Sequence, residues 1–317
     1  MDYELFNYLK SRKSVAIFVH VNPDWDCMGS AFALRHALRN NGVKSDIFTN
    51  APLSHHLNFM ETDVCVYEEG NTPPDYECYC AVDVGSADRV GAWADAFMSK
   101  EDTVCIDHHI KQEKFAKKSL VESSRSATGE LIFEILNAVN EKITKEIAQY
   151  LYCAISSDTG SFQYASVNKR TFEIVTLLLQ TGIDTSYLCS MLYERNTLKQ
   201  LRLQAAAIES IKLYGNGKIA TASITREILE KYSAEKSDTE GLAQIPRKID
   251  GVMISAFLTE LNDGNVRVSL RALGDYDIEP VAKKFGGGGH KKAAGCTFIN
   301  MNADCAEKML VDELVKL

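Results

Sequence analysis

Acidic residues and histidines follow apolar stretches of this sequence, at positions where buried strands would end. The first stretch, SVAIFV, is followed by HVNPDWD, which contains His20, Asp24 and Asp26. Burying carboxylates costs free energy unless positive charge lies opposite them, and no lysine or arginine occurs between His20 and Ser30. Either this segment is a solvated loop or it binds a cation.

Three further segments carry side chains of the same kind. Asp83 follows the apolar run CYCAV, and Asp158 lies at the end of a predicted helix. The segment TVCIDHH ends another apolar run and supplies Asp107, His108 and His109. Parallel strands direct their carboxyl ends to one edge of a sheet, where ligands bind. A lone aspartate after a strand is usually a turn former, but this clustering favours a metal site.

The donor types restrict the metal. Carboxylates and imidazoles without a thiolate favour an octahedral ion such as Mn²⁺ over tetrahedral zinc. Six such donors exceed the need of one ion that leaves room for a substrate, so two ions bridged by a carboxylate fit better. The nine cysteines form no C-x-x-C pair and are expected to be reduced thiols. Another histidine pair, His55 and His56, is interpreted as a chance doublet on a loop.

Apolar periodicity predicts the elements that must position these groups. From residue 14 to residue 107, short apolar runs alternate with helical patterns, which indicates βαβ units. The runs are almost continuously apolar, as in parallel strands covered by helices on both faces of the sheet. Residues 126–184 are expected to be helical, with Ser126 or Thr128 as one cap and Thr144 as the next.

A change from helical to strand-like hydrophobic patterns marks the boundary between two predicted domains. Residues 186–214 are predicted to form one long helix, whereas β-branched runs and the turn NDG follow from residue 215 onward. We therefore expect an α/β protein. It would have an N-terminal parallel-sheet domain at 1–185 that binds the metal, a helical linker at 186–214 and a smaller C-terminal α/β domain at 215–317.

Composition limits the class of protein. The chain has 317 residues, of which 45% are hydrophobic and 25% charged, as in soluble globular proteins. The net charge of −8 argues against general binding of long nucleic acid, which depends on broad neutralisation of phosphates. We find no apolar run of about 18 residues that would suggest a membrane span, and no signal-peptide core. We expect a cytoplasmic protein.

A glycine-rich segment, KKFGGGGHKKAAG, has the character of an anion site. Successive glycines allow backbone N–H groups to approach an anion closely, and the candidates here are Gly287, Gly288 and Gly289. His290 and Arg271 could hold a terminal phosphate, the arginine through two hydrogen bonds. Four lysines add local positive charge: Lys283, Lys284, Lys291 and Lys292.

Five motifs together resemble those of the DHH phosphoesterase superfamily with its DHHA1 substrate domain. In chain order they are HVNPDWDCMGS, VDVGSADRVG, DHH, SSDTGSF and GGGGHKKAAG. The resemblance covers nearly the whole chain and is strongest to the bifunctional nano-RNase/pAp phosphatases, which are oligoribonucleases. It implies a catalytic DHH domain followed by a DHHA1 domain that binds the substrate.

The resemblance implies a ligand set for two Mn²⁺ ions per active site, with Mg²⁺ or Co²⁺ as substitutes. His20 and Asp24 would hold one ion, and Asp83 would bridge the pair. The second ion would be held by the remaining ligands, which are Asp26, His108 and Asp158.

The resemblance also implies roles around the ions. Asp107 would orient His108, and His109 would lie beside the scissile phosphate as a stabiliser or proton donor. The nucleophile would be a hydroxide that bridges the metals. Trp25 stands where the family often has a small residue, and we expect it to pack in the core, with a platform near the site as the alternative.

The implied function is hydrolysis of very short oligoribonucleotides (nanoRNA) to mononucleotides, together with removal of the 3′-phosphate from pAp. The C-terminal grip would hold one end of a short nucleotide while the metals cut at the other. One alternative is hydrolysis of cyclic di-AMP or linear dinucleotides, and a second is a non-catalytic nucleotide-binding protein. Neither long duplex DNA nor a membrane is an expected partner, and a homodimer is compatible with the resemblance.

Overall fold

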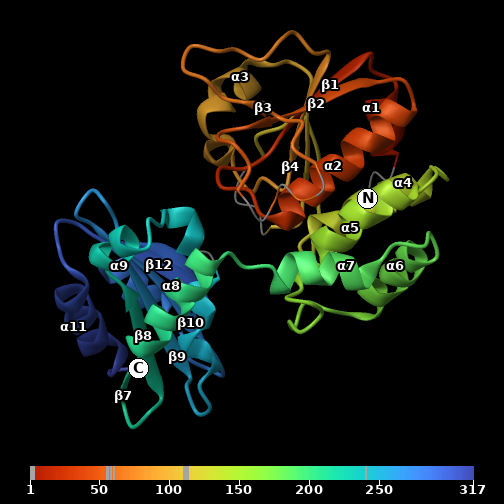
Figure 1. Ribbon diagram of the computed structural model, residues 1–317. Helices are drawn as coiled ribbons and strands as arrows, with labels where there is room; N and C mark the ends of the chain where they lie inside the picture. Colours follow the sequence, from red (N-terminus) through yellow and green to blue (C-terminus); the bar gives the residue numbers. More distant parts are fainter. Residues whose placement is uncertain (1–3, 55–56, 58, 60, 110–113, 240) are drawn as a thin grey trace. The chain divides into compact units, whose positions relative to one another are not determined.

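The computed structural model describes residues 4–317 except 55–56, 58, 60, 110–113 and 240. The histidine pair at 55–56 therefore lies outside the described residues. The chain forms two compact units, Met1–Arg195 and Asn196–Leu317, and each is described by itself (Figure 1). The division falls within the range expected for the linker.

The first unit contains a six-stranded sheet in which every neighbouring pair of strands is parallel, as predicted. The order across the sheet is β3-β2-β1-β4-β5-β6. The short strand β6 was not expected from the sequence. The strands are β1 (Ser14–Phe18), β2 (Lys44–Thr49), β3 (Cys65–Val66), β4 (Cys78–Val82), β5 (Thr103–Asp107) and β6 (Lys118–Val121).

Helices cover both faces of this sheet. Along β1, Val15 and Ile17 belong to one core cluster, whereas Ala16 and Phe18 belong to another that includes Trp93. Successive strand residues point to opposite faces, so each face is buried separately. The helices of the first unit are α1 (Leu5–Lys10), α2 (Trp25–Asn40), η1 (Ala87–Trp93), α3 (Ala94–Ser99), α4 (Thr128–Ala138), α5 (Lys145–Asp158), α6 (Lys169–Leu179), α7 (Thr185–Cys189) and η2 (Ser190–Glu194).

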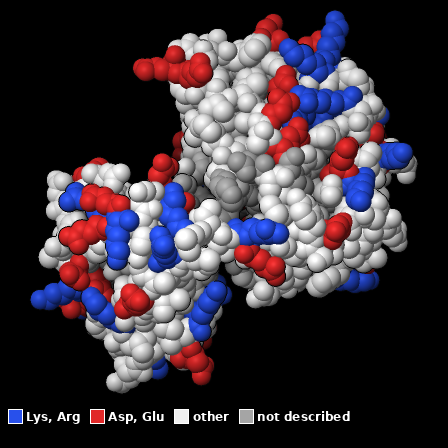
Figure 2. Space-filling model, in the orientation of Figure 1, with Lys and Arg blue, Asp and Glu red and all other residues white. Residues whose placement is uncertain are grey.

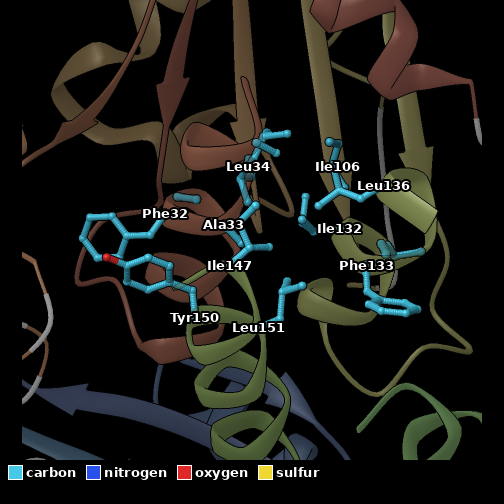
Figure 3. Packing of buried hydrophobic residues seen from close by; sticks show 14 of the residues in the cluster. Phe32, Ala33, Leu34, Ile106, Ile132, Phe133, Leu136, Ile147, Tyr150 and Leu151 are labelled. Carbon is cyan, nitrogen blue, oxygen red and sulfur yellow. The ribbon is translucent and has the colours of Figure 1, made fainter. Parts of the chain in front are cut away.

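Close packing of α2 against α5 sets the positions of the start of α2 and the end of α5, which carry predicted site residues. Phe32 of α2 and Tyr150 and Ile147 of α5 lie together in the core (Figure 3). A Cβ atom at Gly29 would lie 2.5 Å from the backbone oxygen of Tyr150, so only glycine allows this approach. Gly29 also faces Ala154, which places the beginning of α2 beside the end of α5.

The helix caps agree with the sequence in one case and differ in another. Thr144 caps α5, with its side chain accepting the N–H of Ile147. The N-cap of α4 is Ala127, and neither of the expected residues caps it. Ser126 donates its hydroxyl proton to Glu130, and the hydroxyl of Thr128 donates to Asp83. The first N–H groups of α4 are instead bound by the carboxylate of Asp26, which is distant in the sequence.

The expected long helix over 186–214 is wrong. The chain instead forms α7 and the π-helical turn η2, then extends at Arg195 and begins the new helix α8 (Leu198–Glu209). Thr197 and Gln200 form a capping box, which is a strong helix-start signal inside the apparently continuous pattern. The last residues of the range, Lys212–Tyr214, form strand β7.

The second unit contains a smaller mixed sheet in the order β11-β12-β10-β9-β8-β7. All neighbours are antiparallel except β8 and β9. The predicted NDG turn joins β9 to β10, with Gly264 at φ 80°. The further elements are β8 (Ile219–Ile224), α9 (Arg226–Lys231), η3 (Lys236–Thr239), η4 (Leu242–Gln244), η5 (Pro246–Lys248), β9 (Ile254–Glu260), β10 (Val266–Ala272), α10 (Glu279–Lys284), β11 (Gly288–His290), β12 (Ala293–Phe298) and α11 (Ala303–Leu314).

The distribution of charged side chains and the lengths of the helices agree with the composition of a globular protein. On the face drawn in Figure 2, acidic and basic side chains are interspersed on both units. None of the helices in the described part of the chain combines the length and apolar character needed to cross a membrane.

Candidate active site

The order of the strands brings the predicted site residues to one edge of the first sheet. β1, β4 and β5 are neighbours, and His20, Asp83 and His108 follow their carboxyl ends. Asp26 lies in the first turn of α2, and Asp158 is the last residue of α5. Ligand atoms of Asp26, His108 and Asp158 lie within 4.8 Å of one another. Residues far apart in the sequence thus form one cluster.

Asp26 is held by the N-terminus of α4. Its Oδ2 accepts the N–H of Thr128 at 2.7 Å, and its Oδ1 accepts the N–H of Gly129 at 2.9 Å. These are backbone donors that a helix leaves unsatisfied at its start, and the helix dipole there favours negative charge. The buried carboxylate is therefore fixed in orientation before any ligand arrives.

Asp83 lies at the centre of the cluster. Its Oδ1 accepts the hydroxyl proton of Thr128 at 2.7 Å. Three histidine nitrogens surround it at longer range: Nε2 of His20 at 3.6 Å, Nε2 of His108 at 3.8 Å and Nδ1 of His109 at 3.5 Å. These separations exceed those of good hydrogen bonds. Asp83 also has φ 59°, a conformation that costs free energy for a residue other than glycine.

Backbone carbonyls set the orientation of two imidazoles. Nδ1 of His20 lies 2.8 Å from the carbonyl oxygen of Val21, and Nδ1 of His108 lies 3.2 Å from that of Arg125. In the tautomer that donates its Nδ1 proton to the carbonyl, each ring directs the lone pair of Nε2 toward the carboxylates. For His108, the Oδ2 atom of Asp158 is 3.4 Å away. This is the arrangement that a metal-binding imidazole needs.

The expected contact from Asp107 to His108 is wrong. Oδ1 of Asp107 instead contacts Nδ1 of His109 at 2.7 Å and accepts the backbone N–H of His109 at 3.2 Å. An aspartate readily accepts the N–H two residues ahead in such turns, which favours contact with His109 over contact with the intervening His108. Asp107 therefore positions His109, the member of the pair that is 42% exposed.

The pKa values show a shortage of positive charge. Burial, followed by the charge of Asp83, raises the pKa of Asp26 well above its usual range, and burial raises that of Asp158 to about 6. Burial would also raise the pKa of Asp83, but His20 and the other histidines lower it. The hydrogen bond to Asp107 raises the pKa of His109 to about 9. Burial thus disfavours the ionised forms of Asp26 and Asp158, and a bound cation would favour them.

The donor set fits divalent cations. Among the described residues, the ion pairs of Asp26, Asp83 and Asp158 are with histidines alone. Asp24 is placed differently, because its Oδ1 caps α2 by accepting the N–H of Cys27 at 3.0 Å. It does not enter the groups of three donors within 4.8 Å that the described residues form.

The structure adds a thiol to this donor set. Cys27 is fully buried, and its Sγ lies within 4.8 Å of ligand atoms of both His20 and Asp83. A buried thiol that the sequence analysis did not consider as a ligand therefore lies beside the oxygen and nitrogen donors. The available signal was the position of Cys27 directly after Asp26, in the first turn of α2.

Arg89 is a second residue that the sequence analysis did not single out. Its guanidinium is exposed and lies close enough for its charge to oppose protonation of His109. The carbonyl oxygen of Arg89 accepts the N–H of Val21 at 2.8 Å, which ties it to the residue after His20. Within the described residues, no carboxylate pairs with its guanidinium. An unpaired arginine at an acidic site is suited to bind an anionic substrate.

Trp25 packs in the core, as expected. It is 6% exposed and its ring lies 4.8 Å from that of Phe59. The platform alternative is not supported by this burial.

The glycine-rich segment of the second unit forms a strand. Gly288, Gly289 and His290 make up β11, which pairs with β12. A Cβ atom at Gly287 would lie 2.0 Å from the backbone oxygen of Gly295, so part of the glycine requirement is close packing. A Cβ at Gly288 would meet nothing within 4 Å, which leaves that position open to a ligand.

Three of the four nearby lysines have internal partners. Lys283 lies 2.9 Å from Glu279, and Lys284 lies 2.8 Å from Glu313. Lys292 donates to the carbonyls of Gly274 and Tyr276. Their contribution to an anion site is therefore smaller than the sequence suggested.

Arg271 and His290 lie on the same face of the second sheet. Both pair with Ala293, Arg271 from β10 and His290 from β11. Cross-strand partners point to the same face, and two strand spacings separate the pair by roughly 10 Å. Because Ala293 is small, the space between the two basic side chains is not filled by its neighbour.

Comparison with known proteins identifies the family. The model of the DHH family, N-terminal domain, matches residues 14–155, and that of the DHHA1 domain matches residues 216–316. The chain belongs to the DHH/DHHA1 phosphoesterase family. It is therefore an enzyme of the class that hydrolyses phosphate and phosphodiester bonds.

Three similar proteins span almost the whole chain. A probable bifunctional oligoribonuclease and PAP phosphatase NrnA of Streptococcus mutans is 28% identical, with 90% of each chain covered. The bifunctional oligoribonuclease and PAP phosphatase NrnA of Bacillus subtilis is 26% identical, covering 98% of this chain and 97% of the relative. The crystal structure of an exopolyphosphatase-related protein from Bacteroides fragilis has a TM-score of 0.91 and 26% identity, with 99% and 97% covered.

Proposed function

We propose that this protein is a Mn²⁺-dependent phosphoesterase that hydrolyses very short oligoribonucleotides to mononucleotides and removes the 3′-phosphate from pAp. The observation that carries the proposal is the cluster of buried carboxylates and imidazoles at the ends of β1, β4 and β5, with no lysine or arginine paired to it among the described residues. The substrate class follows from the activities named for the two relatives.

Two ions would be held by this cluster. His20 and Asp24 would hold the first, and Asp83 would be shared. The second would be held by the three donors that already lie together, Asp26, His108 and Asp158. When bound, such dications acidify water and neutralise charge on phosphoryl oxygens. Mn²⁺ suits the oxygen and nitrogen donors, and Mg²⁺ or Co²⁺ would be substitutes.

The protein's own groups would complete the reaction. Asp107 fixes one ring nitrogen of His109, so the exposed ring can present its other nitrogen to the phosphate or the leaving oxygen. Arg89 would bind a non-bridging phosphate oxygen at the rim of the site. Both side chains stabilise negative charge that develops as the phosphate ester breaks.

The second unit would bind another part of the nucleotide. Arg271 and His290 flank Ala293 on one face of the sheet, and Gly288, two residues before His290 on β11, has open space beside its Cα. A phosphate held there would receive charge-assisted hydrogen bonds. Gly287 and Gly289 would support this site by letting β11 approach β12.

A substrate panel tests the proposal. Purified protein with Mn²⁺ is offered pAp, pApA, a five-residue RNA, a long single-stranded RNA and cyclic di-AMP, and release of phosphate or mononucleotide is measured. We expect turnover of pAp and the short RNAs and much slower turnover of the long strand.

Other outcomes of the panel would select the alternatives. Turnover of cyclic di-AMP or linear dinucleotides without pAp hydrolysis would identify a dinucleotide phosphodiesterase. Binding of these nucleotides without turnover of any of them would identify a non-catalytic nucleotide-binding protein and remove the proposal.

A further inference from the structure

Cys27 brings sulfur to one side of the candidate metal site. Its Sγ, a nitrogen of His20 and a carboxylate oxygen of Asp83 all lie within 4.8 Å of one another. All three residues are at least 96% buried. Imidazole, carboxylate and thiol together form the donor set of a tetrahedral site for a soft or borderline ion.

The one separation between His20 and Asp83 suits a shared ion, and Cys27 Sγ lies within 4.8 Å of both. Ligand atoms on a tetrahedral zinc ion are separated by roughly 3.3–3.8 Å, given bond lengths of about 2.0–2.3 Å. Nε2 of His20 lies 3.6 Å from Oδ2 of Asp83, within that interval. The thiol of Cys27 donates to the carbonyl oxygen of Val82 at 3.4 Å, so its lone pairs point away from that carbonyl.

Burial, followed by the charges of Asp83 and Asp24, raises the pKa of the Cys27 thiol well above its usual range, so the sulfur is protonated until a cation binds. Cys27 lies in the first turn of α2, a 16-residue helix. The N-terminus of such a helix stabilises negative charge, and a metal-coordinating thiol is deprotonated. The other fully buried thiols, such as Cys153 in α5, do not enter a donor group in the described part of the chain.

We propose that Cys27, with His20 and Asp83, forms a binding site for a thiophilic dication of the zinc, cobalt(II) or cadmium class. This inference rests on the proposed metal site, of which it uses two ligands. Binding breaks the S–H bond of Cys27, forms a metal–sulfur bond and releases the proton to solvent. A hard ion such as Mn²⁺ leaves the thiol protonated, so Cys27 decides which ions the site prefers.

Cobalt(II) provides a direct test in the full-length, metal-free protein. We expect Co²⁺ to produce a near-ultraviolet sulfur-to-cobalt charge-transfer absorption in the wild type. Cys27→Ser should bind Co²⁺, as measured by calorimetry, without this absorption. Cys153→Ser, an equally buried helical thiol, should retain it. Circular dichroism checks folding, and Cys27→Ala serves as a second variant.

Affinities provide the second measurement. We expect Zn²⁺ to bind Cys27→Ser about tenfold or more weakly than wild type, with Mn²⁺ affinity little changed. Co²⁺ binding to the wild type without the absorption, or an absorption that persists in Cys27→Ser, would overturn the inference and leave the metal site intact. Failure of the wild type to bind either Co²⁺ or Mn²⁺ would overturn the proposed metal site as well.

Discussion

The strand ends of the first unit and the glycine-rich strand of the second unit differ in how their charges are balanced. At the first sheet, Asp26, Asp83 and Asp158 pair with histidines alone among the described residues. At the second, Lys283 and Lys284 are paired with glutamates from the same unit. The first region is therefore suited to bind cations, whereas the lysines of the second are largely paired.

This difference implies a division of labour. The first region would supply the chemistry, because unbalanced buried carboxylates bind cations strongly. The second would supply binding through Arg271 and His290, which are placed on one face by strand register. Substitutions in the first region should lower turnover, and substitutions in the second should weaken substrate binding.

The largest expected effect is that of Asp83→Asn. The substitution keeps the shape but removes the central negative charge of the cluster. Hydrolysis of pAp should fall roughly a thousandfold, equivalent to about 4 kcal/mol of transition-state stabilisation. Steady-state kinetics with Mn²⁺ measure this. The control is Asp88→Asn, an exposed aspartate in η1, which should be nearly neutral. Loss of less than about tenfold in Asp83→Asn would contradict a central role.

Asp107→Asn should give the next largest effect and separates two roles for this residue. Because Asp107 contacts His109, we expect kcat to fall about a hundredfold while Mn²⁺ affinity stays close to that of the wild type. Kinetics and calorimetry on the same preparation make the comparison. A loss of Mn²⁺ affinity without the kinetic defect would show that Asp107 acts on the metal ligands instead.

Much of the first region could be predicted because its signals are local. Apolar runs defined the strands, and the carboxyl ends of parallel strands must share an edge, so the convergence of His20, Asp83 and His108 followed from topology. The contact of Asp107 with His109 could not be predicted, because it depends on the turn at the end of β5. Cys27 was missed because its proximity to His20 requires α2 to be packed in place.

The second region was harder to predict from sequence. Four glycines and four lysines are typical of an open anion-binding loop. Their actual arrangement includes the strand β11 and lysines paired with Glu279, one turn earlier in α10, and with Glu313 of α11, of which only the second is a tertiary partner. The prediction of one long helix over residues 186–214 was wrong for the opposite reason. There the decisive signal, the cap at Thr197, was local, but the continuous apolar periodicity obscured it.

Arg271→Ala tests the binding role of the second region. Loss of charge-assisted hydrogen bonds worth about 1.5–3 kcal/mol should raise KM for pAp roughly 10- to 100-fold with little change in kcat. Lys283→Ala, which removes a lysine paired with Glu279, is the matched control and should change KM little. A fall in kcat at unchanged KM would place Arg271 in the chemistry rather than in binding.

The smallest expected effect concerns Glu61, a carboxylate of the first unit that has partners within the same unit. Burial would raise the pKa of Glu61, but hydrogen bonds from His36 and Tyr150 and the charge of Arg35 lower it from 4.5 to about 2. A lowered folded pKa stabilises the protein above pH 4.5, and this contribution is lost as the pH falls toward 2.

Denaturant titrations of wild type and Glu61→Gln check this pH dependence. At pH 7 the variant should be less stable by about 1–2 kcal/mol, and the difference should shrink below pH 4.5. A difference that stays constant down to pH 3 would show that the charge of Glu61 is not what stabilises the fold.

The most direct test of the account is anomalous X-ray scattering from crystals soaked in Mn²⁺, recorded at the manganese absorption edge. We predict two anomalous peaks within bonding distance of the cluster, one beside His20 and one beside His108, both next to Asp83. The absence of peaks there, in crystals that show manganese bound elsewhere, would contradict the claim that these strand ends form a dication site.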